Sequence, residues 1–232
     1  MWFTLGVTVA ACLFAAATWR LREPRSSSVQ PPYRFDVELQ SDGELGSEVG
    51  TDVVISPDGT HVVFVARGSD GVARLNTHSL DRADFTELPG TEGALGPFFS
   101  PDGRWVGFMA SGKLKKIPIA GGLPVILCDA PDLLGASWGD DGSIIAAITR
   151  GRLWRVSSSG GSPTVLLDLA AESDAPVWPQ FLPGANRLLF TTNGAPGANA
   201  ATIEVLSLAD GRRKVLVRGG SSAATSTAIC CT

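Results

Sequence analysis

The chain has 232 residues, a formal net charge of −4 at pH 7 and a sequence pI near 5.2. This acidic balance excludes a nucleic-acid-binding surface as the main function, because such a surface needs clustered basic side chains. Glycine (27) and proline (15) are frequent and 44% of the residues are hydrophobic, which is typical of many short strands joined by turns around a sizeable core.

The first segment is apolar. Residues 1–19 contain no charged side chain, and at about 1.5 Å per residue a helix of this length reaches roughly across the hydrocarbon core of a bilayer. We therefore expect a single transmembrane anchor. A cleaved signal peptide is the alternative, although the segment lacks the basic first part that is usual in such peptides.

Basic residues follow the expected anchor at Arg20, Arg22 and Arg25. Taken alone, the positive-inside rule places them, and the rest of the chain, in the cytoplasm. Residues 20–32 are rich in serine, proline and arginine and are predicted to be an extended linker. Residues 33–39 (YRFDVEL) alternate in polarity and are predicted to form a strand, which either opens the first sheet or completes the last one.

A tight turn followed by an apolar strand recurs along the rest of the chain. In the copy that begins at Ser100, proline presets φ, Gly103 tolerates a positive φ, and Asp102 can accept a hydrogen bond from the backbone two residues on. The residues that precede the four turns are spaced by 44, 39 and 43 positions: Ile55, Phe99, Trp138 and Phe181. A period of about 40 with several short strands per unit is typical of β-propeller blades.

Each repeat continues with two more strands. The third strands carry apolar residues at matching places, and Gly-Gly or Asp-Gly dipeptides mark the following hairpin in three of the repeats. Fourth strands are visible at 125–128 and 165–168. The prediction is an all-β β-propeller fold made of four-stranded blades at about residues 49–90, 94–130, 134–170 and 174–218.

The second strand of each repeat is expected to form the core, because stacked sheets cover both faces of the inner strands. The side chains predicted to be buried between blades are Val62 and Phe64, Val106 and Phe108, Ile145 and Ala147, and Leu188 and Phe190.

The fourth repeat contains a surface loop at residues 193–201, and residues 219–232 are predicted to be an irregular tail rather than a further blade. Four blades are expected to form an open, incomplete propeller, with closure of four blades as the alternative. In an open arrangement the outer faces of the first and fourth blades lack a neighbouring sheet. Residues 33–218 alone are therefore expected to self-associate or to unfold with low cooperativity.

The turn motif also carries a family resemblance. The Ser-Pro-Asp-Gly turn before an apolar strand resembles the TolB-like, WD-repeat-like β-propeller repeat of bacteria. Residues 98–125 (FFSPDGRWVGFMASGKLKKIPIAGGLPV) resemble more narrowly the propeller attached to bacterial transmembrane serine/threonine kinases. The resemblance implies a propeller placed outside the cytoplasm, after a kinase domain and one membrane span. The motif is informative for fold but weak for function, because propellers host many unrelated roles.

Two motifs resemble catalytic signatures. Gly135, Ser137 and Gly139 match the G-x-S-x-G nucleophile elbow, but that chemistry needs a strand-turn-helix setting and a histidine later in the chain. The two histidines, His61 and His78, both precede the motif. We therefore predict that Ser137 is not a nucleophile.

The second motif is a near match to a phosphate-binding P-loop at residues 107–114 (GFMASGKL). Leu114 stands where serine or threonine should bind magnesium, and no helix is predicted to follow. A hairpin between the second and third strands of the repeat is the better interpretation.

The remaining polar groups are also given structural roles. The aspartates at the turns (Asp58, Asp102, Asp140 and Asp141) are predicted to stabilise the turns rather than to bind calcium. The basic cluster of Lys113, Lys115 and Lys116 is interpreted as a solvated hairpin, and Cys128 as a small buried hydrophobe. No residue is assigned as catalytic, cofactor-binding or metal-binding, and no cofactor is predicted.

The sequence thus predicts a membrane-anchored, non-catalytic β-propeller that binds a protein or small ligand. The resemblance implies the sensor or scaffold portion of a receptor-type serine/threonine kinase whose catalytic domain is not in this chain. The alternatives are the accessory propeller of a prolyl-oligopeptidase-like peptidase and a TolB-like periplasmic scaffold.

Overall fold

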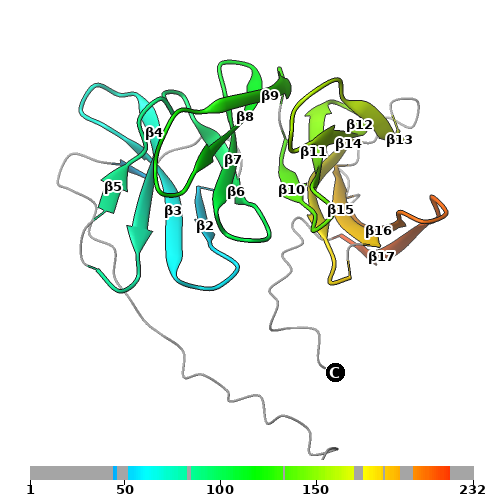
Figure 1. The fold of residues 1–232 in the computed structure, drawn as a ribbon. Coiled ribbons are helices and arrows are strands. Elements are labelled where there is room, and N and C mark those ends of the chain that lie inside the picture. The colour runs from blue at the N-terminus through cyan, green and yellow to red at the C-terminus, as the bar shows by residue number, and fades with distance from the viewer. Residues whose placement is uncertain are drawn as a thin grey trace, which may run out of the picture. The chain divides into compact units, whose positions relative to one another are not determined.

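The structure is a computed structural model that describes residues 44–45, 52–82, 85–132, 134–169, 175–184, 186–193 and 201–219. Within these ranges every regular element is a β-strand, and each sheet is antiparallel throughout (Figure 1). The predicted anchor, linker, first strand at 33–39 and the tail from residue 220 lie outside the described residues, as does most of the predicted loop at 193–201. The part of the chain that the structure describes contains no helix able to cross a membrane.

The strands form four sheets in chain order. The first sheet contains β1 (Glu44–Leu45), β2 (Val53–Ile55), β3 (His61–Arg67), β4 (Ala73–Ser79) and β5 (Phe85–Glu87). The second contains β6 (Leu95–Phe99), β7 (Trp105–Ala110), β8 (Lys113–Pro118) and β9 (Val125–Asp129). The third contains β10 (Ala136–Trp138), β11 (Ser143–Thr149), β12 (Arg152–Ser157) and β13 (Thr164–Asp168). The fourth contains β14 (Ala175–Phe181), β15 (Arg187–Asn193), β16 (Thr202–Ser207) and β17 (Arg213–Arg218).

The second, third and fourth sheets are simple up-and-down meanders of four strands, and β2 to β5 form the same meander within the five-stranded first sheet, so the prediction of four-stranded antiparallel units is confirmed. The first sheet differs in one respect. The two-residue strand β1, which the sequence pattern does not mark, pairs with the end of β3 at Ala66 and Arg67, while β2 pairs with the earlier part of that strand.

Three apolar clusters fill the interfaces between consecutive sheets. The first joins β3 and β4 to β7, the second joins β8 and β9 to β11, and the third joins β11 and β12 to β15 and β16. All eight side chains that the sequence placed in the core are at most 2% exposed. The second strand of each repeat is therefore the buried strand, as predicted.

The side chains named for the third repeat are buried between sheets as predicted, but they lie on the opposite face of their strand from those of the second repeat. The turn before β7 spans from Ser100 to Trp105, whereas the turn before β11 spans only from Gly139 to Ser143. Because side chains alternate along a strand, this loss of one residue turns Ile145 towards the fourth sheet rather than the second.

The first repeat departs from the prediction that its core side chains lie between two sheets. Val62 and Phe64 are buried, but they lie on the face of β3 opposite to Val63 and Val65, which pack against the second sheet. The Phe64 ring instead meets the Phe85 ring edge to face at 6.1 Å.

Candidate functional site

The Ser-Pro-Asp-Gly turn between β6 and β7 is held by its own side chains. Ser100 Oγ donates to Asp102 Oδ1 at 2.6 Å and accepts from the Trp105 backbone N–H at 2.9 Å. Asp102 Oδ1 also accepts from the Arg104 backbone N–H at 3.1 Å, which confirms the predicted bond two residues on. The turn therefore fixes the start of β7 and with it the position of Trp105.

The turn before β3 repeats this arrangement, with Ser56 Oγ donating to Asp58 Oδ1 at 2.6 Å and accepting from the His61 N–H at 2.9 Å. Before β11, Asp141 accepts from both the backbone and the side chain of Ser143. The aspartates thus take part in turn formation, as the sequence predicts. The part that serine plays was not predicted. Among the described residues, no three His, Cys, Asp or Glu side chains are grouped to hold a metal ion.

Acid is expected to weaken these turns. Hydrogen bonds from Ser56 and Ser100, followed by those from the backbone, lower the pKa of Asp58 and of Asp102 to about 2 from the ordinary 3.8. A carboxyl whose pKa is lower in the folded state stabilises the fold above its unfolded pKa and loses that contribution as the pH falls through its folded pKa. The urea midpoint should therefore fall between about pH 4 and pH 2.

A variant with Asp58→Asn and Asp102→Asn together should show a smaller fall, because its turns no longer contain these titrating groups. The measurement is urea unfolding at several pH values within this window. An equal fall in the wild type and the variant would contradict a role for these two carboxylates.

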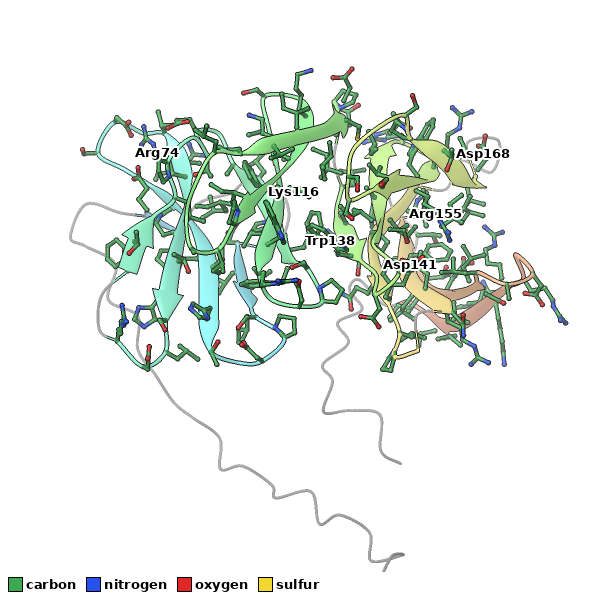
Figure 2. The ribbon with its side chains drawn as sticks, viewed as in Figure 1. Arg74, Lys116, Trp138, Asp141, Arg155 and Asp168 are labelled. Carbon is green, nitrogen blue, oxygen red and sulfur yellow. The ribbon has the colours of Figure 1, made fainter. Side chains whose placement is uncertain are left out.

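A cleft of about 500 Å³ opens between the second and third sheets, beside the turn at Ser100. Its central side chain is Lys116 on β8, which Figure 2 shows close to Trp138 on β10. Lys116 Nζ lies 4.4 Å from the centroid of the Trp105 ring and 5.9 Å from that of Trp138. It also donates to the backbone oxygen of Ser158 at 2.8 Å. The ammonium group thus joins two sheets and two indole rings.

The cleft has the chemistry of a recognition site. An ammonium group has three donors, and Ser158 uses one of those on Lys116. Two half-buried indole rings provide apolar area, and the carboxylates of Asp102 and Asp140 are exposed at the rim. Tryptophan and cationic side chains at the centre of a patch often dominate the energy of protein interfaces. The described residues that line the cleft include no histidine or cysteine.

The basic cluster seen in the sequence is divided by the structure. Lys113 forms an ion pair with Asp129 at 2.5 Å on the exposed side of the hairpin, as expected of a solvated strand. Lys116 is half-buried and enters the cleft, which corrects the solvated interpretation for this residue. The sequence signal is present but ambiguous, because a lysine in an alternating strand can face either water or a neighbouring sheet.

The G-x-S-x-G motif lies where the third sheet packs against the fourth. Ser137 lies within β10, and its Oγ accepts the backbone N–H of Phe181 on β14 at 3.2 Å. A Cβ on Gly135 would come within 2.9 Å of the Trp178 Cα, and one on Gly139 within 2.8 Å of the Phe181 ring. The period-two spacing therefore puts three small residues on one face of the chain, where the fourth sheet approaches closely.

The P-loop-like segment is a hairpin, as predicted. Ser111 and Gly112 both have positive φ (55° and 68°) and form the two-residue turn between β7 and β8, as in a type I′ hairpin. Gly107 lies within β7, directly across from Phe98. Cys128 is buried in the cluster between the second and third sheets, in agreement with its assignment as a small hydrophobe.

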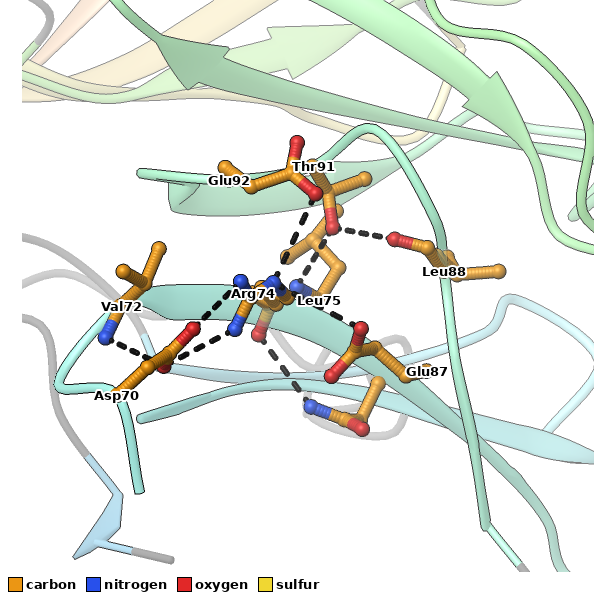
Figure 3. Close-up of polar contacts among 9 residues, drawn as sticks. Asp70, Val72, Arg74, Leu75, Glu87, Leu88, Thr91 and Glu92 are labelled. Atoms are coloured by element: carbon orange, nitrogen blue, oxygen red, sulfur yellow. Dashed lines mark hydrogen bonds and ion pairs between the residues drawn. The ribbon is translucent and has the colours of Figure 1, made fainter. Parts of the chain in front are cut away.

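A second polar cluster surrounds Arg74 on β4 (Figure 3). Its guanidinium forms ion pairs with Asp70 at 2.7 Å and with Glu87 and Glu92 at 3.7 Å each. The hydrogen bonds from Arg74 lower the pKa of Asp70 to about 2. The ion pairs link the β3–β4 hairpin to the segment around β5. Because three carboxylates already surround the single positive charge of Arg74, the cluster does not favour an external anion.

Comparison with known proteins identifies the fold. No family model and no curated sequence matches the chain. Among solved structures, TolB from Acinetobacter baumannii is 16% identical with a TM-score of 0.60, over 72% of this chain and 43% of that protein. A putative TolB from Agrobacterium tumefaciens is 16% identical with a TM-score of 0.59, over 75% and 67% of the two chains. The β-propeller domain of the Trilobed protease from Pyrococcus furiosus is 12% identical with a TM-score of 0.51, over 73% and 57%.

These likenesses, together with the four stacked antiparallel sheets, define the fold as that of part of a β-propeller. The particular likeness is to the TolB type, as the turn motif suggested. The chain spans less than half the length of the A. baumannii protein. At these sequence identities the likeness shows the fold alone, so any function has to be argued from the site.

Proposed function

We propose that this chain is a non-catalytic binding module that recognises a segment of a partner protein in the cleft between the second and third sheets. The observation that carries the proposal is the position of Lys116 between Trp105 and Trp138 in an open cleft. Aromatic anchors beside a cation and carboxylates suit a peptide with both an apolar and a polar side chain.

In its cellular setting, the module is proposed to be anchored in a membrane by residues 1–19 and to lie outside the cytoplasm. The resemblance of residues 98–125 supports a sensor or scaffold role next to a serine/threonine kinase. The structural likeness to TolB supports a periplasmic scaffold as a second candidate. The likeness to a protease propeller domain supports an accessory role beside a peptidase. In all three roles the propeller binds and a neighbouring domain or partner acts.

The binding test uses the whole chain to select short random peptides by display and then measures their affinity. Selected peptides should lose at least about tenfold in affinity for Trp105→Ala. They should bind equally well to Val165→Ser, a matched change at a half-exposed residue on β13, away from the cleft. Peptides that bind Trp105→Ala as tightly as the wild type, or the absence of any selected peptide, would contradict the proposal.

The non-catalytic part of the proposal has its own test. Neither the wild type nor Ser137→Ala should hydrolyse a chromogenic ester or peptide, because Ser137 Oγ is engaged by β14 and both histidines lie in the first sheet. Hydrolysis that is present in the wild type and lost in Ser137→Ala would overturn it.

A further inference from the structure

The outer strands of three sheets share one irregularity. In β9, β13 and β17 the pairing with the preceding strand shifts by one residue, and the extra residue is a leucine each time: Leu127, Leu166 and Leu216. Leu127 is 4% exposed and belongs to the cluster between the second and third sheets. Leu166 packs against the cluster between the third and fourth sheets. The bulge thus presents a leucine to the sheet that follows in the chain.

Leu216 breaks this pattern, because it is 51% exposed. Its neighbour Val217 is 48% exposed, and the exposed cations of Lys214 and Arg218 lie on the same strand. We call Lys214, Leu216 and Val217 the Leu216 surface. It has the form of a packing surface for another sheet, and the described residues leave it open to solvent.

A second exposed apolar surface lies on the first sheet, and it is confined to β2, because Val62 and Phe64 on the paired strand β3 are buried. The residue before each turn packs on the preceding sheet in the second, third and fourth repeats, where it is Phe99, Trp138 and Phe181. Ile55 occupies this position in the first repeat and is 56% exposed, and its neighbour Val53 is 43% exposed. We call Val53 and Ile55 the Ile55 surface.

The first and fourth sheets also have net charges of opposite sign. In residues 52–82 and 85–94 the charged side chains are mainly acidic: Asp52, Asp58, Asp70, Asp81, Glu87 and Glu92, with Arg67, Arg74 and Arg82. In the described residues from 175 to 219 they are mainly basic: Arg187, Arg212, Arg213, Lys214 and Arg218, with Glu204 and Asp210. Opposite charge favours and orients an encounter between the fourth sheet of one molecule and the first sheet of another.

We propose that the Leu216 surface docks on the first sheet of a second copy of this chain, around its Ile55 surface. The contact is heterologous, so one molecule uses its fourth sheet and the other its first. It places a bulged leucine against the next sheet, as Leu127 and Leu166 already lie at two of the interfaces within the chain. This inference does not depend on the ligand of the cleft, which lies between the second and third sheets.

The test places photoreactive benzoylphenylalanine at position 216 of the whole chain, in detergent micelles, with equal amounts of unlabelled and ¹⁵N-labelled protein. Mass spectrometry should find crosslinks from position 216 of one isotopic form to the first sheet of the other. The same probe at position 165, where Val165 is 49% exposed on β13, should give no such crosslink. Crosslinks confined to one isotopic form, or no crosslinks at all, would overturn the proposal.

A second measurement uses sedimentation of the whole chain in the same micelles. Leu216→Asp should weaken self-association by at least about tenfold, whereas Val165→Asp should leave it unchanged. Raising the ionic strength should weaken it in the wild type, because exposed charges are screened. Association that is equally strong in Leu216→Asp would place the contact elsewhere and reject the proposal.

Discussion

Replacing Phe108 with alanine should lower the free energy of unfolding by about 3–5 kcal/mol, the usual cost of emptying a large aromatic site in a core. Phe108 is fully buried on β7 and belongs to the cluster that joins the first and second sheets. Val63 and Leu75 of the first sheet, in the same cluster, are themselves fully buried. They are held by strand pairing, so the cavity cannot collapse easily.

Urea unfolding followed by tryptophan fluorescence measures this loss. Leu123→Ala is the matched control, since Leu123 is 87% exposed and its truncation should change stability by no more than about 0.5 kcal/mol. A loss below about 1 kcal/mol for Phe108→Ala would mean that the first and second sheets do not pack as described.

The repeat is what made the fold predictable from the sequence. Turn residues at intervals of about 40 predict the order of the strands along the chain. The apolar strand after each turn is buried on both faces, so its burial does not depend on which sheet a given side chain points towards. The prediction was therefore right about the burial of Ile145 even though this side chain faces the fourth sheet. Its direction depends on the length of one turn, Gly139 to Ser143, which the alignment of the repeats treated as equal to the others.

The cleft could not be predicted in the same way. Lys116 and Ser158 are 42 residues apart, and Trp105 and Trp138 belong to different repeats. Their meeting depends on how one sheet stacks on the next, which no local pattern records. The small residues at 135, 137 and 139 are likewise explained by the stacking of one sheet on the next. They look like an enzyme motif in the sequence, but the approach of β14 accounts for each of them.

Gly107 leads to the second large expected effect. A glycine inside a strand normally weakens it, and often marks a place where another group approaches the backbone. Here that group is the ring of Phe98, directly across on β6. A Cβ on Gly107 would lie 2.2 Å from Phe98 Cζ and 2.4 Å from Cε2. The Phe98 ring is held in turn by the Trp138 ring, at a centroid distance of 6.3 Å.

Gly107→Ala should therefore lower the free energy of unfolding by about 1–3 kcal/mol, because the added methyl group must displace a packed ring. Shortening that ring should relieve the conflict, so the variant with both Gly107→Ala and Phe98→Leu should be more stable than the sum of the two single losses predicts. The coupling measured by urea unfolding of all four proteins should be about 0.5–3 kcal/mol in favour of the double variant. Additive losses would show that the ring of Phe98 does not lie on Gly107. They would also contradict the packing of Phe98 against Trp138, which positions Trp138 in the cleft.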